Sequence, residues 1–597
     1  MAAHRDENKR SALKTWVRAL ERTAAIERNR ALTLPALIDR LGERFGDAPA
    51  LLSVDAQLSY RELAAACHRY ARWGLARGLS RADTVCLVMA NCPDYMAIWL
   101  GLSAIGATVA LINTNLRAAL LAHALNLVAP RVIIVDASLS EAIGAVRPLL
   151  HPAVECWLSG AAHAGLPRLD EELAKLPGEP LRVSELAAPP TLEDRALCIY
   201  TSGTTGVPKA ANVSHYRLMQ WSHWFAGLID VQPEDRMYDC LPMYHSVGGV
   251  VATGATLVGG GAVVLRERFS ASNFWQDVVA ERCTLFQYIG ELCRYLLAHP
   301  PQQEESQHAL RAACGNGLRA EVWREFQQRF RIPQILEYYA ATEGNFSLYN
   351  CEGRPGAIGR VPPFLAHRLP VAVVKFDPDV EAPLRDASGR CVRCAPNQPG
   401  EAIAQILDMH GSTRFEGYTD DIASSKKILR DVFAPGDAWY RSGDLMRQDE
   451  QGFFYFVDRV GDTFRWKGEN VSTAEVAGVI TGCSGVVDAA VYGVTVPGTD
   501  GRAGMAALVT GEGFDLAALR RALQERLPAY ARPLFLRIVA AIELTGTFKL
   551  RKHELALEGY DPTRIRDAVY IEDRERNEYV PLDARLHEQL QAGVLRL

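Results

Sequence analysis

The chain has 597 residues, enough for about four folding units of average size or for fewer large ones. Its 48% of hydrophobic residues can fill several cores, and a net charge of −5 offers no basic surface, so we expect no nucleic-acid partner. The odd number of cysteines, 13, predicts reduced thiols in a cytoplasmic protein, and the charged residues 1–10 do not resemble a secretory signal.

Residues 11–26 predict an amphipathic helix. Its apolar side chains repeat at helical spacing and form one stripe, made of Leu13, Trp16, Val17, Leu20 and Ala24. The basic residues Lys14, Arg18 and Arg22 lie off the stripe. Two interpretations stay open, because such a helix can lie on a membrane surface as a peripheral anchor or can cover its own domain.

Residues 31–195 alternate between helix-like and strand-like segments. The pattern predicts helices at 61–75 and 95–102 and strands at 84–89 and 132–136. Alternation of this kind is typical of parallel sheets with helices on their faces. The stretch 95–112 carries no charge, but it contains Gly101 and Thr108, so we expect a buried helix leading into a buried strand and no membrane span.

A strand at 196–200 leads into Tyr200-Thr-Ser-Gly-Thr-Thr-Gly-Val-Pro-Lys209. Gly203 and Gly206 allow the backbone to approach a ligand closely, and Lys209 adds a positive charge. Open amides and hydroxyls suit a phosphate, and the hydroxyls come from Thr201, Ser202, Thr204 and Thr205. The spacing differs from that of the Walker loop, which needs Gly-Lys-Ser/Thr. The alternative is a polar surface turn that binds no ligand.

The rest of the chain divides into three parts. A helix at 216–228 is followed by further βα units up to about residue 340. Short strands and turns at 368–457 predict a small β-rich subdomain. Residues 459–597 predict a separate α+β domain, with strands at 489–494 and 505–509, a helix at 516–526 and an apolar run at 534–540. We therefore expect an N-terminal domain over 1–458, with 1–30 as a helical extension, and a C-terminal domain over 459–597.

Two further motifs fit a nucleotide. In Tyr339-Ala-Ala-Thr342-Glu343-Gly344 an aromatic ring can stack on a base, a hydroxyl can reach a phosphate and a carboxylate can hold Mg²⁺. In Tyr440-Arg-Ser-Gly443-Asp444 the carboxylate can accept hydrogen bonds from both hydroxyls of a ribose.

Together these motifs resemble the adenylate-forming superfamily of acyl-CoA synthetases, luciferases and adenylation domains. The resemblance implies that the loop at 201–209 binds phosphates, that Tyr339 stacks on adenine and that Thr342 contacts the α-phosphate. It also implies that Glu343 binds Mg²⁺ and that Asp444 and Arg459 contact the ribose. Many members carry Asp or Lys two positions after this arginine, where this chain has Gly461.

Thr545-Gly-Thr-Phe-Lys549 resembles the segment that carries the mobile catalytic lysine of the superfamily. A cation supplied only in the transition state would stabilise the charge that develops on the phosphates. The motif favours Lys549 for this role, and the nearby Lys552 stays an alternative. The resemblance further implies that the C-terminal domain rotates, withdrawing Lys549 and bringing residues 461–471 inward for the second half-reaction.

Three segments resemble the branch of fatty acid transport proteins and very-long-chain acyl-CoA synthetases: 286–294, Gly315-Asn-Gly-Leu-Arg319 and Asp458–Ser472. By this resemblance Gly315 and Asn316 belong to the nucleotide site. Residues 244–249 and 286–290 would form the acyl wall, with Tyr244, His245 and Gly290 lining the acyl site. Glycines there would leave room for a chain. His245 can contact the carboxylate, or it can be a packed core histidine.

We therefore expect an α/β enzyme with a mobile α+β C-terminal domain. It would join a long- or very-long-chain fatty acid to coenzyme A, with ATP and Mg²⁺, through an acyl-adenylate. Alternatives are a ligase for a bile-acid-like or aryl carboxylate, an acyl-AMP ligase for a carrier protein, and a membrane-associated fatty acid uptake protein. Chain length and oligomeric state are not encoded in these motifs.

Overall fold

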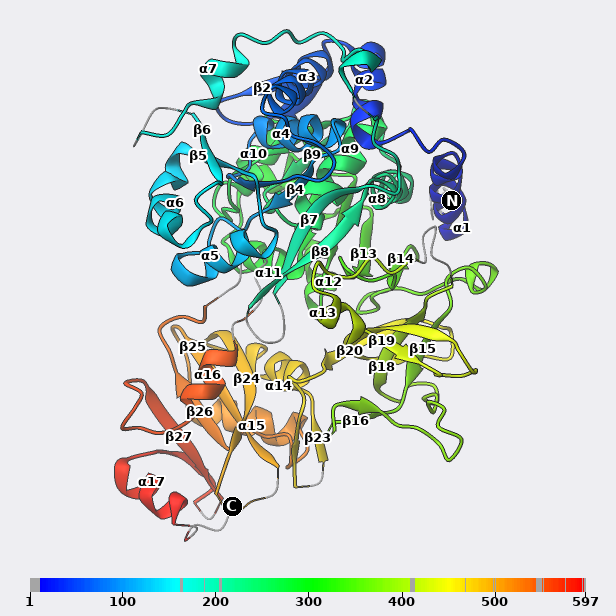
Figure 1. Cartoon of the computed structure of the whole chain (residues 1–597). Coiled ribbons are helices and arrows are strands. Elements are labelled where there is room, and N and C mark those ends of the chain that lie inside the picture. Colours follow the sequence, from blue (N-terminus) through cyan, green and yellow to red (C-terminus); the bar gives the residue numbers. More distant parts are fainter. Residues whose placement is uncertain are drawn as a thin grey trace, which may run out of the picture. The chain divides into compact units, whose positions relative to one another are not determined.

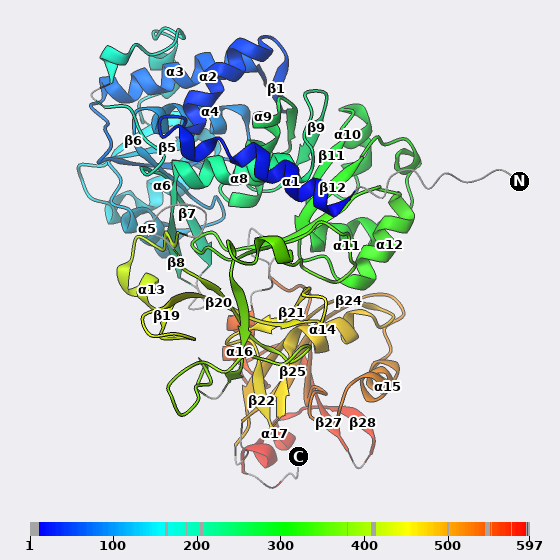
Figure 2. The same cartoon turned by 90° about the vertical axis from the view of Figure 1, so that its right-hand side faces the viewer.

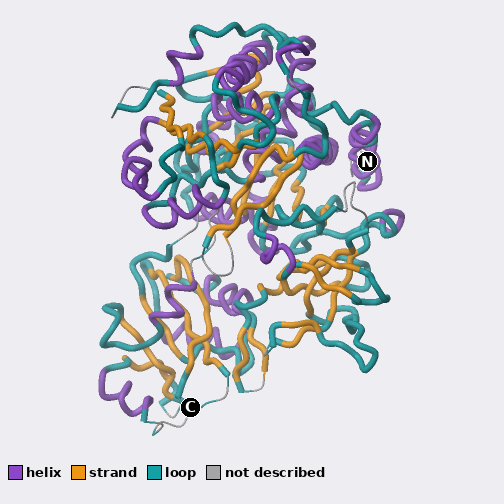
Figure 3. The backbone as a smooth tube through the Cα atoms, viewed as in Figure 1, coloured by secondary structure: helices purple, strands orange, loops and turns teal. Residues whose placement is uncertain are grey.

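The computed structural model describes residues 11–160, 165–186, 188–202, 207–378, 380–407, 414–467, 469–497, 499, 501–543, 550, 552–574, 576–592 and 594. The chain forms two compact units, Met1–Leu369 with Gln405–Leu429, and Pro370–Ala404 with Arg430–Leu597 (Figure 1). Helices and strands alternate in the first unit, as predicted for an α/β protein (Figure 3). The predicted domain boundary between 458 and 459 stays a prediction, because the two compact units meet in the chain at other positions, 369/370, 404/405 and 429/430.

Within its described residues, the first unit has an eight-stranded sheet in the order β14-β13-β12-β11-β9-β10-β1-β2. The inner strands from β13 to β1 are parallel, and β14 and β2 run antiparallel at the edges. The strands are β1 (Pro49–Leu52), β2 (Gln57–Ser59), β9 (Arg236–Asp239), β10 (Ala262–Leu265), β11 (Leu285–Ile289), β12 (Ala312–Asn316), β13 (Ile335–Ala340) and β14 (Ser347–Asn350).

A second sheet of this unit has the order β6-β5-β3-β4-β7-β8. It is parallel except for the hairpin of β7 and β8, which carries the predicted phosphate loop. The strands are β3 (Thr84–Val88), β4 (Thr108–Leu111), β5 (Val132–Asp136), β6 (Glu155–Ser159), β7 (Arg195–Ser202) and β8 (Pro208–Ser214). The predicted strands at 84–89 and 132–136 are thereby confirmed.

Helices fill the space between the two sheets and cover their outer faces (Figure 2). One core joins Leu51 and Val263 of the large sheet, Leu87 of the second sheet and three helices, α2 (Leu34–Phe45), α3 (Tyr60–Ala76) and α4 (Pro93–Ala104). On the other face of the second sheet, Ile133 and Val135 pack with α5 (Ala118–Leu127) and α6 (Ser140–Val146). The outer face of the large sheet meets α10 (Phe274–Ala280), where the rings of Phe286 and Phe274 lie 4.7 Å apart.

The uncharged stretch 95–112 lies inside the protein. Most of α4 is buried, and β4 follows it as a fully buried strand, as predicted. Among the described residues, no helix combines the length and the apolar character needed to cross a bilayer.

Helix α1 (Ala12–Thr23) packs on α8 (His215–Leu228) with a face that includes Trp16 and Leu20 of the predicted stripe but leaves Leu13 and Val17 outside. Trp16 is buried against Trp224 and Tyr349, with ring centroids 5.8 and 5.7 Å apart. Leu13 and Val17 of the predicted stripe are 56% and 41% exposed. The buried positions beside Trp16 are instead small, namely Thr15, Ala19 and Thr23.

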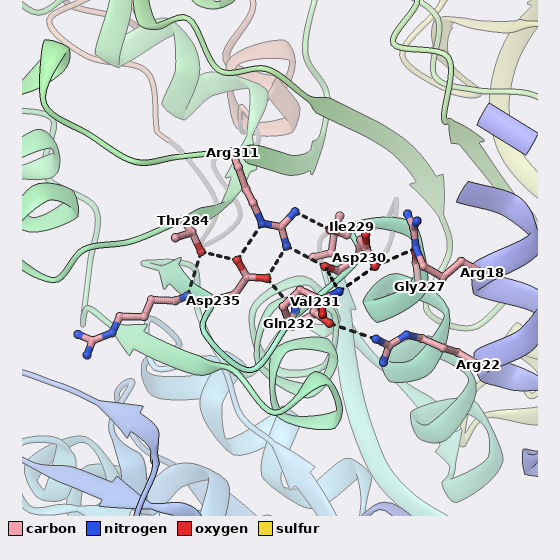
Figure 4. A network of polar contacts seen from close by, with 11 residues as sticks. Arg18, Arg22, Gly227, Ile229, Asp230, Val231, Gln232, Asp235, Thr284 and Arg311 are labelled. Atoms are coloured by element: carbon pink, nitrogen blue, oxygen red, sulfur yellow. Dashed lines mark hydrogen bonds and ion pairs between the residues drawn. The ribbon is translucent and has the colours of Figure 1, made fainter. Parts of the chain in front are cut away.

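Two arginines beside the stripe contribute to this packing. Arg18 Nε donates to Gly227 O in the last turn of α8 at 2.6 Å, and Arg22 Nη2 donates to Val231 O just beyond this helix at 3.1 Å (Figure 4). Arg18 also pairs with Asp230 at 3.3 Å. A cation at a helix C-terminus is favourable because it complements the free carbonyls there. Of the two interpretations, these contacts favour a helix that covers its own domain.

Gly227→Ala tests this packing, because the contact predicts that the substitution lowers the free energy of unfolding rather than raising it. A Cβ on Gly227 would lie 2.5 Å from Ala19 Cα, so we expect the free energy of unfolding to fall by about 1–3 kcal/mol in denaturant titrations. Gly144→Ala in α6 is the matched control, because its Cβ would meet no atom within 4 Å. The control should gain about 0.5–1 kcal/mol from helix propensity. A similar gain for Gly227→Ala would show that α1 does not pack there.

The second unit is built mainly from two sheets. One joins β15 (Val371–Val374), β18 (Gly400–Gln405) and β20 (Ala438–Gln448), with β21 (Phe454–Arg459) on β20. The other has the order β24 (Val486–Thr495), β25 (Arg502–Thr510), β26 (Phe535–Ile538), β27 (Ala568–Asp573) and β28 (Glu578–Pro581), and packs with α14 (Thr473–Thr481) and α15 (Leu516–Arg526). The predicted β-rich and α+β segments are confirmed, and α15 begins and ends at the predicted residues.

Candidate active site

Several predicted site residues lie at one edge of the large sheet. The neighbouring parallel strands β11, β12 and β13 end at Ile289, Asn316 and Ala340, so Gly290, Gly315 and Tyr339 come to the same edge. Ligands of open α/β sheets bind beyond the carboxyl ends of the strands. The ring of Tyr339 is half-buried and lies 5.3 Å from the ring of Phe346, so part of its surface stays accessible for stacking.

Thr342 and Glu343 follow β13 and contact different parts of the first unit. Thr342 Oγ1 lies 3.3 Å from Ser246 Oγ, next to the predicted acyl wall. The Glu343 side chain is 9% exposed, and its Oε1 lies 3.7 Å from Lys427 Nζ. The Glu343 carbonyl accepts from the Gly417 N–H at 3.2 Å, and Gly417 O in turn accepts from the N–H of Asn212 in the hairpin of the predicted phosphate loop. Burial is the main reason that the pKa of Tyr418 is raised.

The predicted phosphate loop connects β7 and β8. Thr201 pairs with Lys209 across the hairpin, and Ser202 is the last residue of β7. Lys209 Nζ lies 5.6 Å from the centre of the Tyr418 ring. The remaining residues assigned to phosphate binding, Gly203, Thr204, Thr205 and Gly206, lie outside the described residues.

The predicted acyl wall at 244–249 runs into a π-helix at Val247–Gly254, a rare element that often marks functional sites. Asn115 Nδ2 donates to the Tyr244 hydroxyl at 3.2 Å, and burial raises the pKa of Tyr244 to about 12. The rings of Tyr244 and His245 lie 4.7 Å apart. His245 is half-buried, and neither of the two interpretations of this histidine is excluded by its position.

The glycines of this region do not leave space for an acyl chain, and that expectation was wrong. A Cβ on Gly248 would lie 2.7 Å from Leu241 O, and one on Gly249 would lie 2.3 Å from Met243 O. A Cβ on Gly290 would lie 1.9 Å from Gly317 O. The volume that a side chain would take is therefore filled by backbone, and these glycines permit close packing.

A buried ion pair links two segments of this site, and the sequence motifs did not indicate either of its residues. Arg217 and Glu416 have side chains only 8% and 5% exposed and lie 3.6 Å apart. Arg217 Nη1 donates to Thr342 O at 2.6 Å, and Glu416 accepts from the N–H of Ser214 at 2.7 Å. The pair thus joins the start of α8 to the Tyr-x-x-Thr-Glu motif. These partners are about 125 to 200 positions apart in sequence, so no local pattern indicates them.

Glu337 is a third residue missed by the motifs. It is buried in β13, where its carboxyl accepts from the Tyr288 hydroxyl at 2.6 Å and from the Leu318 N–H at 3.1 Å. Burial raises the pKa of Glu337 to about 8. The contact to Leu318 fixes the turn that follows Asn316. A charged residue inside an otherwise apolar strand was the available signal in the sequence.

The second unit holds the predicted ribose contacts. Asp444 and Arg459 pair across β20 and β21, with Arg459 Nε 3.9 Å from Asp444 Oδ1. Gly461 has φ +93°, and a Cβ there would meet no atom within 4 Å, so glycine is needed for its backbone conformation alone. Lys549 lies outside the described residues, whereas Lys552 Nζ donates to Thr473 Oγ1 at 2.7 Å and pairs with Asp462 at 3.2 Å.

Comparison with known proteins agrees with this geometry. Residues 38–419 match the family model described as AMP-binding enzyme, and residues 475–549 match the AMP-binding enzyme C-terminal domain. Long-chain fatty acid transport protein 1 of Mus musculus is 41% identical over 569 residues, which cover 94% of this chain and 88% of that protein.

Solved structures share the fold. ATP-bound MatB from Rhodopseudomonas palustris has a TM-score of 0.73 at 23% identity and covers 88% of this chain and 99% of its own. A Mycobacterium tuberculosis fatty acyl CoA synthetase has a TM-score of 0.64 at 22% identity, covering 89% and 99%. The predicted fold class is thereby confirmed.

Proposed function

This chain belongs to the family of AMP-binding enzymes and is an AMP-forming acid–thiol ligase, and we propose that its acid is a long- or very-long-chain fatty acid. The reaction would convert the fatty acid, ATP and coenzyme A into acyl-CoA, AMP and diphosphate through an acyl-adenylate. The 41% identity to a protein named for long-chain fatty acids, over 94% of this chain, supports this substrate.

One observation carries the proposal. Thr342 Oγ1 is 3.3 Å from Ser246 in the predicted acyl wall, while the next residue, Glu343, accepts at its carbonyl from Gly417, which is hydrogen-bonded to Asn212 of the phosphate hairpin. Of these two consecutive residues, Thr342 would lie toward the fatty acid and Glu343 toward the phosphates of ATP. Adenylation requires this arrangement, because the carboxylate oxygen must meet the α-phosphorus between the two groups.

The residues present suit ATP and Mg²⁺. The Glu343 carboxylate is a hard oxygen ligand, and its low exposure suits an ion that keeps only part of its water shell. Mg²⁺ there would neutralise charge on the phosphates. Lys209 would bind phosphate as a point charge, and Tyr339 would stack on the adenine. Asp444 and Arg459 would contact the ribose, and Lys549 would stabilise the transition state of the first half-reaction.

A second function of another class, fatty acid uptake at a membrane, is favoured only by the word transport in the relative's name. It is compatible with ligation, since conversion to acyl-CoA would retain the acid inside a cell. Leu13 and Val17 are the exposed apolar residues of 11–26 that could meet a bilayer, and this association stays a prediction.

The test is AMP release by the purified protein with ATP, Mg²⁺ and coenzyme A, over carboxylates from acetate to lignocerate, with benzoate and cholate included. We expect the highest kcat/KM between myristate and lignocerate, with acyl-CoA as the product. Activity restricted to benzoate or cholate would overturn the substrate and retain the ligase. Acyl-AMP formed without acyl-CoA would favour the ligase that serves a carrier protein.

A further inference from the structure

A lysine other than Lys209 lies beside Glu343, the predicted magnesium ligand. Lys427 Nζ is 3.7 Å from Glu343 Oε1, and its side chain is 27% exposed. Both residues belong to the first compact unit, so their proximity does not depend on how the two units are arranged. No motif in the sequence indicated this lysine, because it lies 84 positions after Glu343.

Local hydrogen bonds fix the backbone that carries Lys427. The short helix α13 (Asp421–Ser425) is capped by Asp420, whose Oδ1 accepts from Ile422 N at 2.9 Å. The Lys427 N–H donates to Ser424 O at 3.0 Å. Ser424 Oγ accepts from the Tyr418 N–H at 2.8 Å. These hydrogen bonds therefore join Lys427 and Tyr418 within one segment.

This segment is joined to the phosphate hairpin. Asn212 of β8 donates its N–H to Gly417 O at 3.0 Å, and Thr419 donates its N–H to Ala210 O at 2.9 Å. The bonds flank Tyr418 on both sides and pair it with Ala211 as an isolated bridge. They align the segment with the strand that carries Lys209, so both lysines are brought to the Tyr418–Glu343 pair.

The charges of this cluster suit a polyanion. The ammonium group of Lys427 lies beside the Glu343 carboxylate, and that of Lys209 lies 5.6 Å from the centre of the Tyr418 ring, so two cations border this cluster. A metal ion bound to Glu343 would weaken the attraction of that carboxylate for Lys427. The flexible stem of a lysine would then allow the ammonium group to turn to a phosphate oxygen.

The position also indicates which phosphates would be bound. Thr342, assigned to the α-phosphate, faces Ser246 and the acyl wall. Lys427 lies with Glu343 and Tyr418 on the side of the hairpin, since Tyr418 forms a bridge with Ala211 of β8 and Gly417 donates its N–H to Glu343 O at 3.2 Å. We propose that Lys427 pairs with Glu343 in the free enzyme and binds the phosphates that leave as diphosphate when Mg·ATP enters. This inference rests on the proposed adenylation.

Calorimetric titrations of the full chain with ATP, AMP and inorganic diphosphate, all with Mg²⁺, test the proposal. Because a charge-assisted hydrogen bond is lost, Lys427→Met should weaken ATP and diphosphate about 10- to 100-fold. AMP lacks the phosphates in question and should bind within about 2-fold of the wild type. Lys427→Arg keeps the charge and should restore most of the ATP affinity.

Lys426→Met is the matched control, because Lys426 is the exposed neighbour on the same segment. It should leave all three affinities unchanged. Equal weakening of AMP and ATP by Lys427→Met, or an equal effect of the control, would overturn the inference. Unchanged ATP affinity in Lys427→Met would overturn it too and leave the proposed function standing, whereas a wild type that binds no ATP would overturn the proposed function itself.

Discussion

Lys549→Ala should lower the rate of acyl-adenylate formation by about 10²- to 10³-fold, the effect of removing one transition-state charge partner. Negative charge builds up on the phosphoryl oxygens and on the departing diphosphate only as the carboxylate attacks. A cation that acts at that moment changes kcat and kcat/KM together. Diphosphate release in the absence of coenzyme A measures this step.

The second half-reaction provides the internal control. Thioester formation from supplied acyl-AMP and coenzyme A involves no diphosphate, so Lys549→Ala should leave its rate within about 3-fold. Lys552→Ala is the matched variant, because Lys552 is held by Thr473 and Asp462 and should affect stability without separating the two half-reactions. If Lys552→Ala rather than Lys549→Ala lost only adenylation, the assignment of the two lysines would have to be exchanged.

The second large effect is expected for the buried pair of Arg217 and Glu416. Arg217→Met leaves Glu416 buried without its partner and should lower the free energy of unfolding by about 3–5 kcal/mol. Adenylation by the folded fraction should fall as well, because Thr342 O loses its donor at 2.6 Å. Chemical denaturation and diphosphate release measure the two effects separately.

Arg61→Met is the control for burial. Arg61 and Asp47 lie 2.9 Å apart, closer than the buried pair, but their side chains are 66% and 87% exposed. Solvent screens such a pair, so we expect a loss of about 1 kcal/mol or less. Similar losses in both variants would show that burial does not strengthen the Arg217–Glu416 interaction. The double variant Arg217→Met/Glu416→Gln should recover part of the stability, since no lone charge then stays buried.

These expectations also show what the sequence could provide. Helix α15 and strand β5 were predicted to the residue, because hydrophobic periodicity and flanking turns are local signals. Gly290, Asn316 and Tyr339 were assigned to the site by resemblance to family motifs, and the structure brings them to one edge of the large sheet. The roles of Arg217, Glu416 and Lys427 could not be predicted, because each depends on a contact between distant segments.

Helix α1 shows the same limit for a helix face. The sequence defines an amphipathic helix, but which side packs depends on the surface it meets. Gly227 allows the backbone of Ala19 to approach, and free carbonyls at the end of α8 attract Arg18 and Arg22. Small residues and arginines therefore lie inward, while Leu13 and Val17 stay exposed. Hydrophobicity alone would have oriented the helix differently.

The filled glycine positions limit how this protein can change its substrate range. A larger residue at Gly248, Gly249 or Gly290 would collide with a carbonyl oxygen of a neighbouring segment, so it would separate backbones rather than shorten a pocket. Substitutions at these glycines therefore offer no route to a preference for another acid. At the predicted acyl wall, selection for another acid would act through side chains such as Tyr244, His245 and Ser246, which can change in size without moving the backbone. Libraries designed to alter acyl preference should hold the glycines fixed and vary those residues.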